Sequence, residues 1–293
     1  MTANQRAPLP NLPSVREPRV DAPAADWDAL RAVLRVVECE LNVRCNRACS
    51  YCPQAVGLVP ATDEKMPRDI FEALLADLAR IEYGGRFSHH LYGEPLLDEA
   101  LPANVRRIRS VLPRAVQVLF TNGDLLDDDN HRVLLDAGIA LMVVTRHSVG
   151  AYPDRKQQVV QYAKELQFTS RGGSIGFLAR RHPVERFLGI PCFAPTEMAV
   201  ISWDGRILRC YEDARREEPF GDLRTHTLAA IWAASETKRA ALARGDRAAV
   251  GGACATCDNA NHRSLGSSVG TESFWDTNPE AVAVAAKALE GLR

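Results

Sequence analysis

Seven of the eight cysteines in this chain of 293 residues fall into two groups whose spacing is typical of metal sites. One group occupies the short loop CNRACSYC at 45–52, and the other is spread between residues 192 and 257. The seven are Cys45, Cys49, Cys52, Cys192, Cys210, Cys254 and Cys257. The first residues are rich in proline and charge and lack the apolar stretch of a signal peptide. We therefore expect a cytoplasmic protein in which reduced thiols bind metal instead of forming disulfides.

Segments with the periodicity of strands alternate with segments of helical periodicity from residue 33 to about 180. The expected strands are 34–43, 86–93, 115–123, 140–145 and 174–179, and the expected helices are 67–81, 100–112, 127–138 and 155–166. Repeated strand–helix units predict a parallel sheet with helices outside it. The predicted fold class is α/β, a partial (β/α)6-type barrel with its active site at the carboxyl ends of the strands, where the loop at 45–52 stands.

The alternation ends near residue 190, and the remaining chain has the features of a small separate unit. Residues 197–213 have the pattern of a β-hairpin with Asp204 and Gly205 in its turn, and 228–245 has the pattern of a helix. The predicted domains are a disordered or loosely docked arm at 1–32, the barrel at 33–190, a β-hairpin and helix lobe at 191–262, and a C-terminal extension at 263–293 with a helix at 278–292.

Three thiolates on one short loop can bind three irons of a 4Fe–4S cluster, and CNRACSYC provides them at Cys45, Cys49 and Cys52. A closed site needs a fourth ligand. One iron therefore stays open to a ligand from outside the chain, much as catalytic zinc keeps one position open. A fragment of a zinc site is the alternative interpretation of these three cysteines when they are taken alone.

The same loop resembles the signature of the radical SAM superfamily, including an aromatic residue directly before its last cysteine. YGEP at 92–95 resembles the GGE element of that family, with a tyrosine in place of the first glycine, and TNG at 121–123 ends the third expected strand as in many members. The resemblance implies that the amino and carboxylate groups of S-adenosylmethionine bind the open iron. The cofactor-binding residues that it implies are Tyr51 near the adenine, then Tyr92, Gly93, Glu94, Thr121 and Asn122.

The later cysteines form a second site, in which Cys192 and Cys210 are followed by the pair Cys254 and Cys257. With FGDL at 220–223, this arrangement resembles the Twitch unit, the shortened form of the SPASM domain. A full SPASM domain uses seven cysteines for two clusters. Four remain here, so the resemblance implies one auxiliary 4Fe–4S cluster, ligated entirely by the protein. A structural zinc site with four cysteine ligands is the alternative that the spacing leaves open.

Alternation along the first expected strand separates an apolar face from a polar one. Cys39 falls on the apolar face and is expected to be a core residue instead of a ligand. Glu38, Glu40 and Asn42 then point into the barrel, where a carboxylate is costly unless it is paired or bound to a ligand. Similar reasoning on the other strands adds candidates for substrate contact or for the catalytic base. The candidates are Glu40, His90 on the face of Tyr92 and Glu94, and Arg146 at the end of the fourth strand.

The resemblance implies that a 5′-deoxyadenosyl radical abstracts hydrogen from a C–H bond, and that the auxiliary cluster takes an electron from the deprotonated substrate radical. The net result is a two-electron oxidation, as in the Twitch-bearing dehydrogenases that act on an aminocyclitol or sugar in antibiotic biosynthesis. The implied partners are a small polar substrate and a reducing protein such as flavodoxin or ferredoxin. The formal net charge of −1 and the lack of a long apolar run favour neither nucleic acid nor a membrane.

Three alternatives share some of these motifs. A peptide-modifying maturase would carry both cysteine groups, but such enzymes often have an N-terminal peptide-docking domain, which the arm at 1–32 does not resemble. A redox-neutral radical SAM epimerase or decarboxylase acting on a sugar or nucleotide would also fit. The third alternative is a non-enzymatic zinc module in which both cysteine groups are structural.

Overall fold

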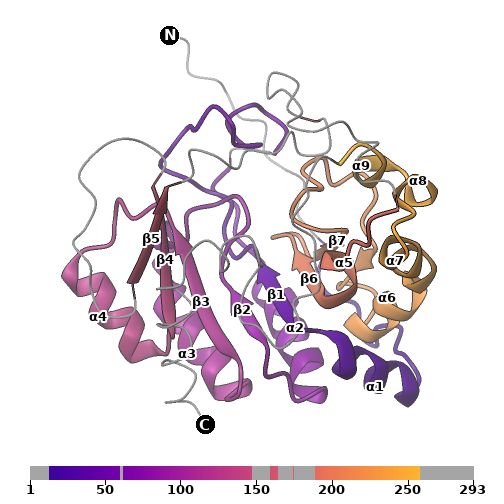
Figure 1. Ribbon diagram of the computed structural model, residues 1–293. Helices are drawn as coiled ribbons and strands as arrows, with labels where there is room; N and C mark the ends of the chain where they lie inside the picture. Colours follow the sequence, from indigo (N-terminus) through magenta and orange to yellow (C-terminus); the bar gives the residue numbers. More distant parts are fainter. Residues whose placement is uncertain (1–12, 60–61, 147–158, 164–173, 175–188, 258–293) are drawn as a thin grey trace.

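The computed structural model describes residues 13–59, 62–146, 159–163, 174 and 189–257, with the backbone alone at 159–163. Its strands form one sheet in the order β5-β4-β3-β2-β1-β6-β7-β8 (Figure 1). The strands are β1 Val36–Cys39, β2 Arg86–Ser88, β3 Val116–Thr121, β4 Leu141–Arg146, β5 Val159–Ala163, β6 Met198–Ile201, β7 Arg206–Leu208 and β8 Gly221–Asp222. The helices are α1 Ala24–Val33, α2 Arg68–Arg80, η1 Pro95–Leu97, α3 Leu101–Val111, α4 Asp128–Ala137, α5 Ala194–Glu197, α6 Leu228–Ala234, α7 Glu236–Ala243, α8 Arg247–Val250 and α9 Gly252–Ala255.

The barrel half is built as the periodicity predicts. Each of β2, β3, β4 and β5 continues a parallel ladder that starts at β1. Helices α2, α3 and α4 cover one face of it, because the apolar stripe of each helix packs against the outward residues of the strands. Cys39 lies in that outer core beside Met66, as expected, while Glu38 turns to the opposite face and pairs with Arg86. The expected alternation of β1 is therefore confirmed.

The helix expected over 155–166 is wrong at its centre, where residues 159–163 form β5 and pair in parallel with β4. Val159, Val160 and Tyr162 favour a strand, and the free edge of β4 offers them a complete ladder. This tertiary pairing overrides the helix-forming Gln and Lys residues beside them. The strand expected at 174–179, apart from residue 174, and the helix expected at 278–292 lie outside the described residues.

The lobe after residue 190 is not the separate unit that the sequence suggests. Its first strand, β6, pairs in parallel with β1, from Val36 opposite Met198 to Cys39 opposite Ile201. Strands β7 and β8 then follow in antiparallel order. The expected hairpin is confirmed, with Gly205 in its turn at a φ of +86°. Because β6 is hydrogen-bonded to β1, the segments that carry the two cysteine groups are attached to one continuous sheet.

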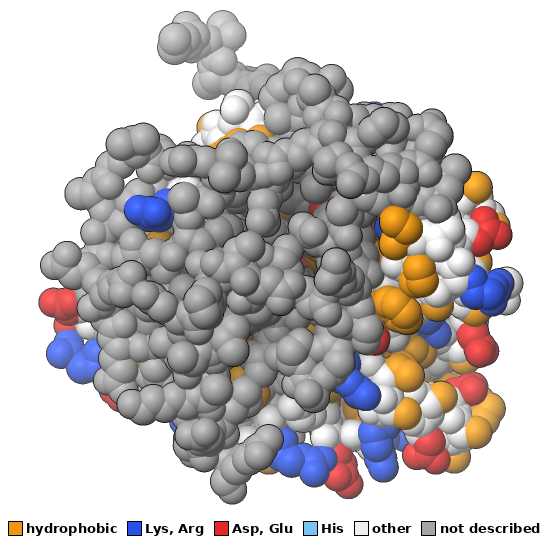
Figure 2. Space-filling model, in the orientation of Figure 1, with side chains coloured by type: hydrophobic (Ala, Val, Ile, Leu, Met, Phe, Trp, Pro, Cys, Tyr) orange, Lys and Arg blue, Asp and Glu red, His pale blue; other side chains and the backbone are white. Residues whose placement is uncertain are grey.

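The long helix expected at 228–245 is two helices, α6 and α7, which meet at Ser235. The hydroxyl of Ser235 donates to the carbonyl of Ile231, which competes with the regular helical ladder at that turn. The acidic and basic side chains visible around the lobe are interspersed with apolar ones, so neither sign dominates that side of the surface (Figure 2). Among the helices of the described residues, none is long and apolar enough to cross a membrane.

The N-terminal segment from residue 13 onward is docked on the lobe, which is the second of the two alternatives, disordered or loosely docked, expected for the arm. Helix α1 lies beside α6 (Figure 1) and buries Trp27 and Leu30 in the main core. Ahead of it, Arg19 donates two hydrogen bonds of 2.9 and 2.7 Å to the carboxylate of Asp77 on α2. Asp77 also accepts from the backbone N–H of Leu228, the first residue of α6. One buried carboxylate thus joins the arm, the barrel and the lobe.

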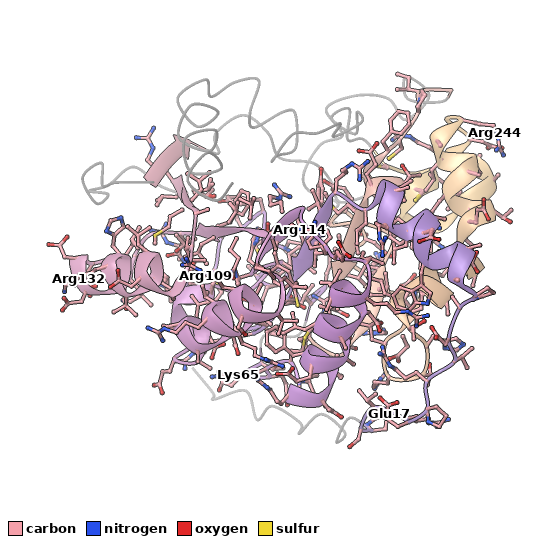
Figure 3. All side chains as sticks on the ribbon, turned by 90° about the horizontal axis from the view of Figure 1, so that it is seen from below. Glu17, Lys65, Arg109, Arg114, Arg132 and Arg244 are labelled. Carbon is pink, nitrogen blue, oxygen red and sulfur yellow. The ribbon has the colours of Figure 1, made fainter. Side chains whose placement is uncertain are left out.

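Replacing Arg19 with alanine would leave the Asp77 carboxylate buried without its cationic partner, which costs about 3 kcal/mol. We expect the melting temperature of the anaerobic protein to fall by roughly 5–10 °C. The control is Arg114→Ala, because Arg114 (Figure 3) pairs with Glu82 on the exposed surface. That change is expected to lower the melting temperature by less than about 3 °C. Equal shifts in the two variants would contradict the role given to Arg19.

Candidate active site

The loop with the first three cysteines follows β1, at the carboxyl edge of the parallel strands. Cys45, Cys49 and Cys52 are all partly exposed, and the backbone N–H of Arg47 points at the sulfur of Cys45 at 3.4 Å. Burial raises the pKa of Cys45, and the negative charges of Glu94, Cys52 and Cys49 raise it further. These groups surround Cys45. The raised pKa keeps its thiol protonated until a bound metal replaces the proton. Three thiolates on one short loop are the ligand set that three irons of a cubane need.

Glu94 of the YGEP element lies buried beside this loop, and its carboxylate is held from three sides. It accepts hydrogen bonds from the hydroxyl of Thr121 at 2.7 Å, the N–H of Asn122 at 2.8 Å and the N–H of Leu96 at 3.0 Å. Burial raises the pKa of Glu94, and these hydrogen bonds oppose the rise. Two of the residues predicted to bind S-adenosylmethionine, Thr121 and Asn122, thus fix the orientation of a third.

The two residues before Glu94 explain why the family element is altered in this chain. A Cβ atom at Gly93 would meet the backbone oxygen of Asn42 at 2.2 Å, so this position requires glycine. Tyr92 replaces the other glycine, and its ring is buried beside Val43. The Tyr92 hydroxyl donates to the backbone oxygen of Tyr211, next to Cys210, at 2.6 Å. The tyrosine therefore connects the first cysteine group to the second.

A clamp of polar side chains ties the cysteine loop to the end of β3. Arg47 donates to both carboxylate oxygens of Asp124, at 2.7 and 2.5 Å, and Asn46 donates to the same group at 2.9 Å. Asn122 completes it by donating to the side-chain oxygen of Asn46 at 2.8 Å. Sequence reasoning missed Asp124, although TNG directly before it was a visible signal.

Glu40, predicted to contact substrate, has another place in the structure. Its carboxylate is 0% exposed, and Arg216 of the lobe reaches both oxygens at 3.0 Å. The backbone N–H groups of Trp203 and Tyr92 also donate to it, at 3.3 and 3.4 Å. Burial raises the pKa of Glu40, and Arg216 opposes that rise. Glu40 is enclosed between barrel and lobe, where it joins the two. Its direct contact with substrate stays a prediction. Nothing in the sequence pointed to Arg216.

The other two candidates are His90 and Arg146. The ring of His90 stacks on Phe120 at a centroid distance of 4.6 Å, on the inner face of the sheet with the Arg86–Glu38 pair. Arg146 is exposed at the end of β4, and alternation puts it on the side of residues that pack against α3 and α4. His90 therefore lies on the inner face of the sheet, as expected. The alternation along β4 places Arg146 on the opposite face.

The second group of four cysteines lines one cavity in the lobe. Cys192 precedes α5, Cys210 follows β7, Cys254 lies in α9 and Cys257 follows that helix. The space among them is open on one side, and its empty volume counted to that side is about 330 Å³. Burial raises the pKa of Cys192 to about 12 and that of Cys210 well above its ordinary value. Thiols that resist ionisation in water lose their protons to a bound metal.

In the described part of the chain, no three side chains of His, Cys, Asp or Glu converge as the ligands of one metal ion do. Four charged residues that sequence reasoning left aside or missed line the same cavity. They are Arg209, Glu212, Asp213 and Arg247.

A partial parallel barrel with a three-cysteine loop at its carboxyl edge, continued by a lobe with four cysteines, defines a radical SAM enzyme of the Twitch type. Residues 192–258 match the SPASM family, described as an iron–sulfur cluster-binding domain. The chain is 30% identical over 208 residues to the S-adenosyl-L-methionine-dependent 2-deoxy-scyllo-inosamine dehydrogenase of Niallia circulans, covering 67% of this chain and 81% of that protein. The chain belongs to the family of that dehydrogenase.

Other relatives agree with this assignment. The structure of BtrN in complex with AdoMet and 2-DOIA superposes with a TM-score of 0.70 and 26% identity, covering 82% of this chain and 97% of that one. The structure of BtrN in an open conformation superposes with a TM-score of 0.66 and 26% identity, covering 80% of this chain and 97% of that one. A GTP 3′,8-cyclase of Aquifex aeolicus (strain VF5) is 28% identical over 171 residues, 54% of this chain and 49% of that protein.

The predicted family, fold class and enzyme class are thereby confirmed. The chain is a radical SAM oxidoreductase that binds S-adenosylmethionine and iron–sulfur. The role of each individual site residue stays a prediction, and two of these roles can be tested directly.

We expect Gly93→Ala to weaken the binding of S-adenosylmethionine at least about tenfold, or about 1.4 kcal/mol, because the new methyl group displaces the loop that carries Glu94. Equilibrium binding to the anaerobic, iron-loaded protein measures this. Gly84→Ala is the matched control, since a Cβ there meets Arg114 at an ordinary 3.4 Å. Unchanged affinity in Gly93→Ala would show that the YGEP element takes no part in binding S-adenosylmethionine.

Asp124→Ala should loosen the cysteine loop, since it removes three hydrogen bonds from Asn46 and Arg47 at once. We expect iron of the first cluster to be lost to a chelator several times faster, while about four irons per chain stay at the unchanged rate. The control is Asp129→Ala, which removes an exposed ion pair with Arg132 on α4. Identical release curves for the two variants would show that the clamp does not hold the loop.

Proposed function

We propose that this enzyme oxidises a hydroxyl group of an aminocyclitol, or of a closely similar sugar-like molecule, to a ketone with the help of two 4Fe–4S clusters. The observation that carries the proposal is the connection between the two cysteine groups. They are attached to one sheet, and Tyr92, the first residue of the GGE-like element, donates a hydrogen bond to the residue after Cys210. A cluster beside the radical site is what an oxidation needs and a redox-neutral reaction does not.

When bound, S-adenosylmethionine with its cluster supplies the radical that removes hydrogen from carbon, and the second cluster supplies a one-electron acceptor. The chain's residues hold and orient these groups. Cys45, Cys49 and Cys52 hold the first cluster. Glu94, fixed by Thr121 and Asn122, accepts a hydrogen bond from the amino group of S-adenosylmethionine. Tyr51 borders the adenine, and Gly93 allows the close approach of the backbone.

Cys192, Cys210, Cys254 and Cys257 hold the auxiliary cluster and close the lobe around it. The substrate lies on the inner face of the sheet near His90, which together with Arg146 is a candidate to contact it or to take up the hydroxyl proton. The apolar stacking of His90 on Phe120 fixes the plane of its ring for such a contact. A substrate with several hydroxyl or amino groups suits this polar interior, where the Arg86–Glu38 pair is also buried.

The electron for S-adenosylmethionine cleavage comes from a small reducing protein such as a flavodoxin or ferredoxin. The cytoplasm is the proposed location, because iron–sulfur ligation by seven thiolates needs a compartment that keeps thiols reduced.

The cluster content is tested by replacing Cys45, Cys49 and Cys52 together with alanine. The parent protein should bind about eight irons, and the variant about four with no cleavage of S-adenosylmethionine. The matched variant changes Cys39 to alanine, a core cysteine that should leave the iron content at about eight. Loss of all iron from the triple variant would argue against two independent clusters.

The reaction is tested by incubating the reduced enzyme with 2-deoxy-scyllo-inosamine, the compound in the name of the Niallia circulans relative. We expect one 5′-deoxyadenosine per molecule of ketone formed and no regeneration of S-adenosylmethionine. A product isomeric with the substrate would instead favour the redox-neutral alternative. If this compound is inert, 5′-deoxyadenosine release with other aminocyclitols and sugars identifies the substrate.

A further inference from the structure

Two arginines are buried in the wall of the cavity that the four later cysteines line. Arg209 and Arg247 are each 1% exposed and are among the largest fully buried side chains of the described residues. Arg209 directly precedes Cys210 on the chain, and Arg247 begins α8. Guanidinium groups are always charged in proteins, so two fixed positive charges border this cavity.

The lobe is shaped to hold the Arg209 guanidinium where it is. Its Nη1 donates to the backbone oxygen of Gly251 at 2.8 Å, and Glu218 forms an ion pair with it. A Cβ atom on Gly252, the first residue of α9, would meet the same Nη1 at 2.4 Å, so the guanidinium packs closely against this glycine. The hydrogen bond, the ion pair and this close packing together fix the position of the Arg209 guanidinium.

Both guanidinium groups share the wall of one cavity with Cys192, Cys210, Cys254 and Cys257. The buried acids Glu212 and Asp213 stand in the same wall and partly balance the arginines. The thiolates of a cluster in this cavity would lie beside two fixed positive charges, and such charges act strongly where burial excludes water.

We propose that Arg209 and Arg247 raise the reduction potential of the auxiliary cluster, so that it accepts the electron released when the substrate becomes a ketone. The proposal rests on the two-cluster function proposed above. After hydrogen abstraction and loss of the hydroxyl proton to a base, the substrate radical gives up one electron and forms the C=O double bond. The cluster gains that electron and one unit of negative charge. A nearby positive charge stabilises the reduced form more than the oxidised form, which raises the potential.

The test measures the potential of the auxiliary cluster alone, in the full-length chain that carries the Cys45, Cys49 and Cys52 alanine changes. An anaerobic redox titration followed by electron paramagnetic resonance is compared for Arg209→Gln, Arg247→Gln and the unaltered arginines. Each Gln variant should shift the reduction equilibrium at least tenfold toward the oxidised cluster, about 59 mV more negative for one electron. Arg209→Lys and Arg247→Lys keep the charge and should shift it much less.

Arg239→Gln is the matched control, since Arg239 is a buried arginine of the same lobe that lies over the ring of Trp232 at 3.9 Å and does not line the cavity. The reduction potential of the auxiliary cluster in this variant should equal that of the parent with the three alanine changes. Unchanged potentials in both cavity variants would overturn the proposal. Loss of iron from the Gln and Lys variants alike would also overturn it, because the arginines would then hold the fold together. If the triple-alanine parent itself binds no iron, the two-cluster function fails instead.

Discussion

The parallel pairing of β1 with β6 is the constraint on which the arrangement of this protein depends. It joins two segments about 160 residues apart in the chain, and parallel pairing always needs such a crossover. The first cysteine loop follows β1, and the ligand Cys210 follows the hairpin that β6 opens. Once the two strands are hydrogen-bonded in register, both cysteine groups are placed by the same sheet. Their separation is then as rigid as the sheet itself.

A buried ion pair joins the barrel to the lobe. Glu40 and Arg216 are both buried, and neither would be tolerated there without the other. Two backbone N–H groups satisfy the remaining capacity of the carboxylate, one from Tyr92 and one from Trp203. A buried pair of this kind contributes more to specificity of position than to stability, because desolvation offsets much of its attraction. It admits one relative placement of the hairpin and the GGE-like element.

Local patterns in the sequence predict much of the fold, and the errors have a common physical cause. Helix α2 and the hairpin turn at Gly205 depend on nearby residues, and both are found as expected. Strand β5 and the β1–β6 pairing depend on which edges of the sheet are free, and local patterns do not reveal these edges. Arg216 is the partner of Glu40 across 176 positions of sequence, so polarity alone made Glu40 resemble a substrate residue. The first cysteine group escapes this limit, since its three ligands lie on one short loop, whereas the four later cysteines were grouped by their resemblance to the Twitch unit.

The departure from the family pattern at Tyr92 illustrates how local irregularity and function coincide. A glycine there would leave the space beside Val43 empty and the carbonyl of Tyr211 without this donor. The ring of Tyr92 fills this space, and its hydroxyl donates a hydrogen bond to this carbonyl. The residue that breaks the motif is therefore the one that couples the cofactor element to the cluster lobe. Sites where local rules fail are where a chain of this kind links its parts.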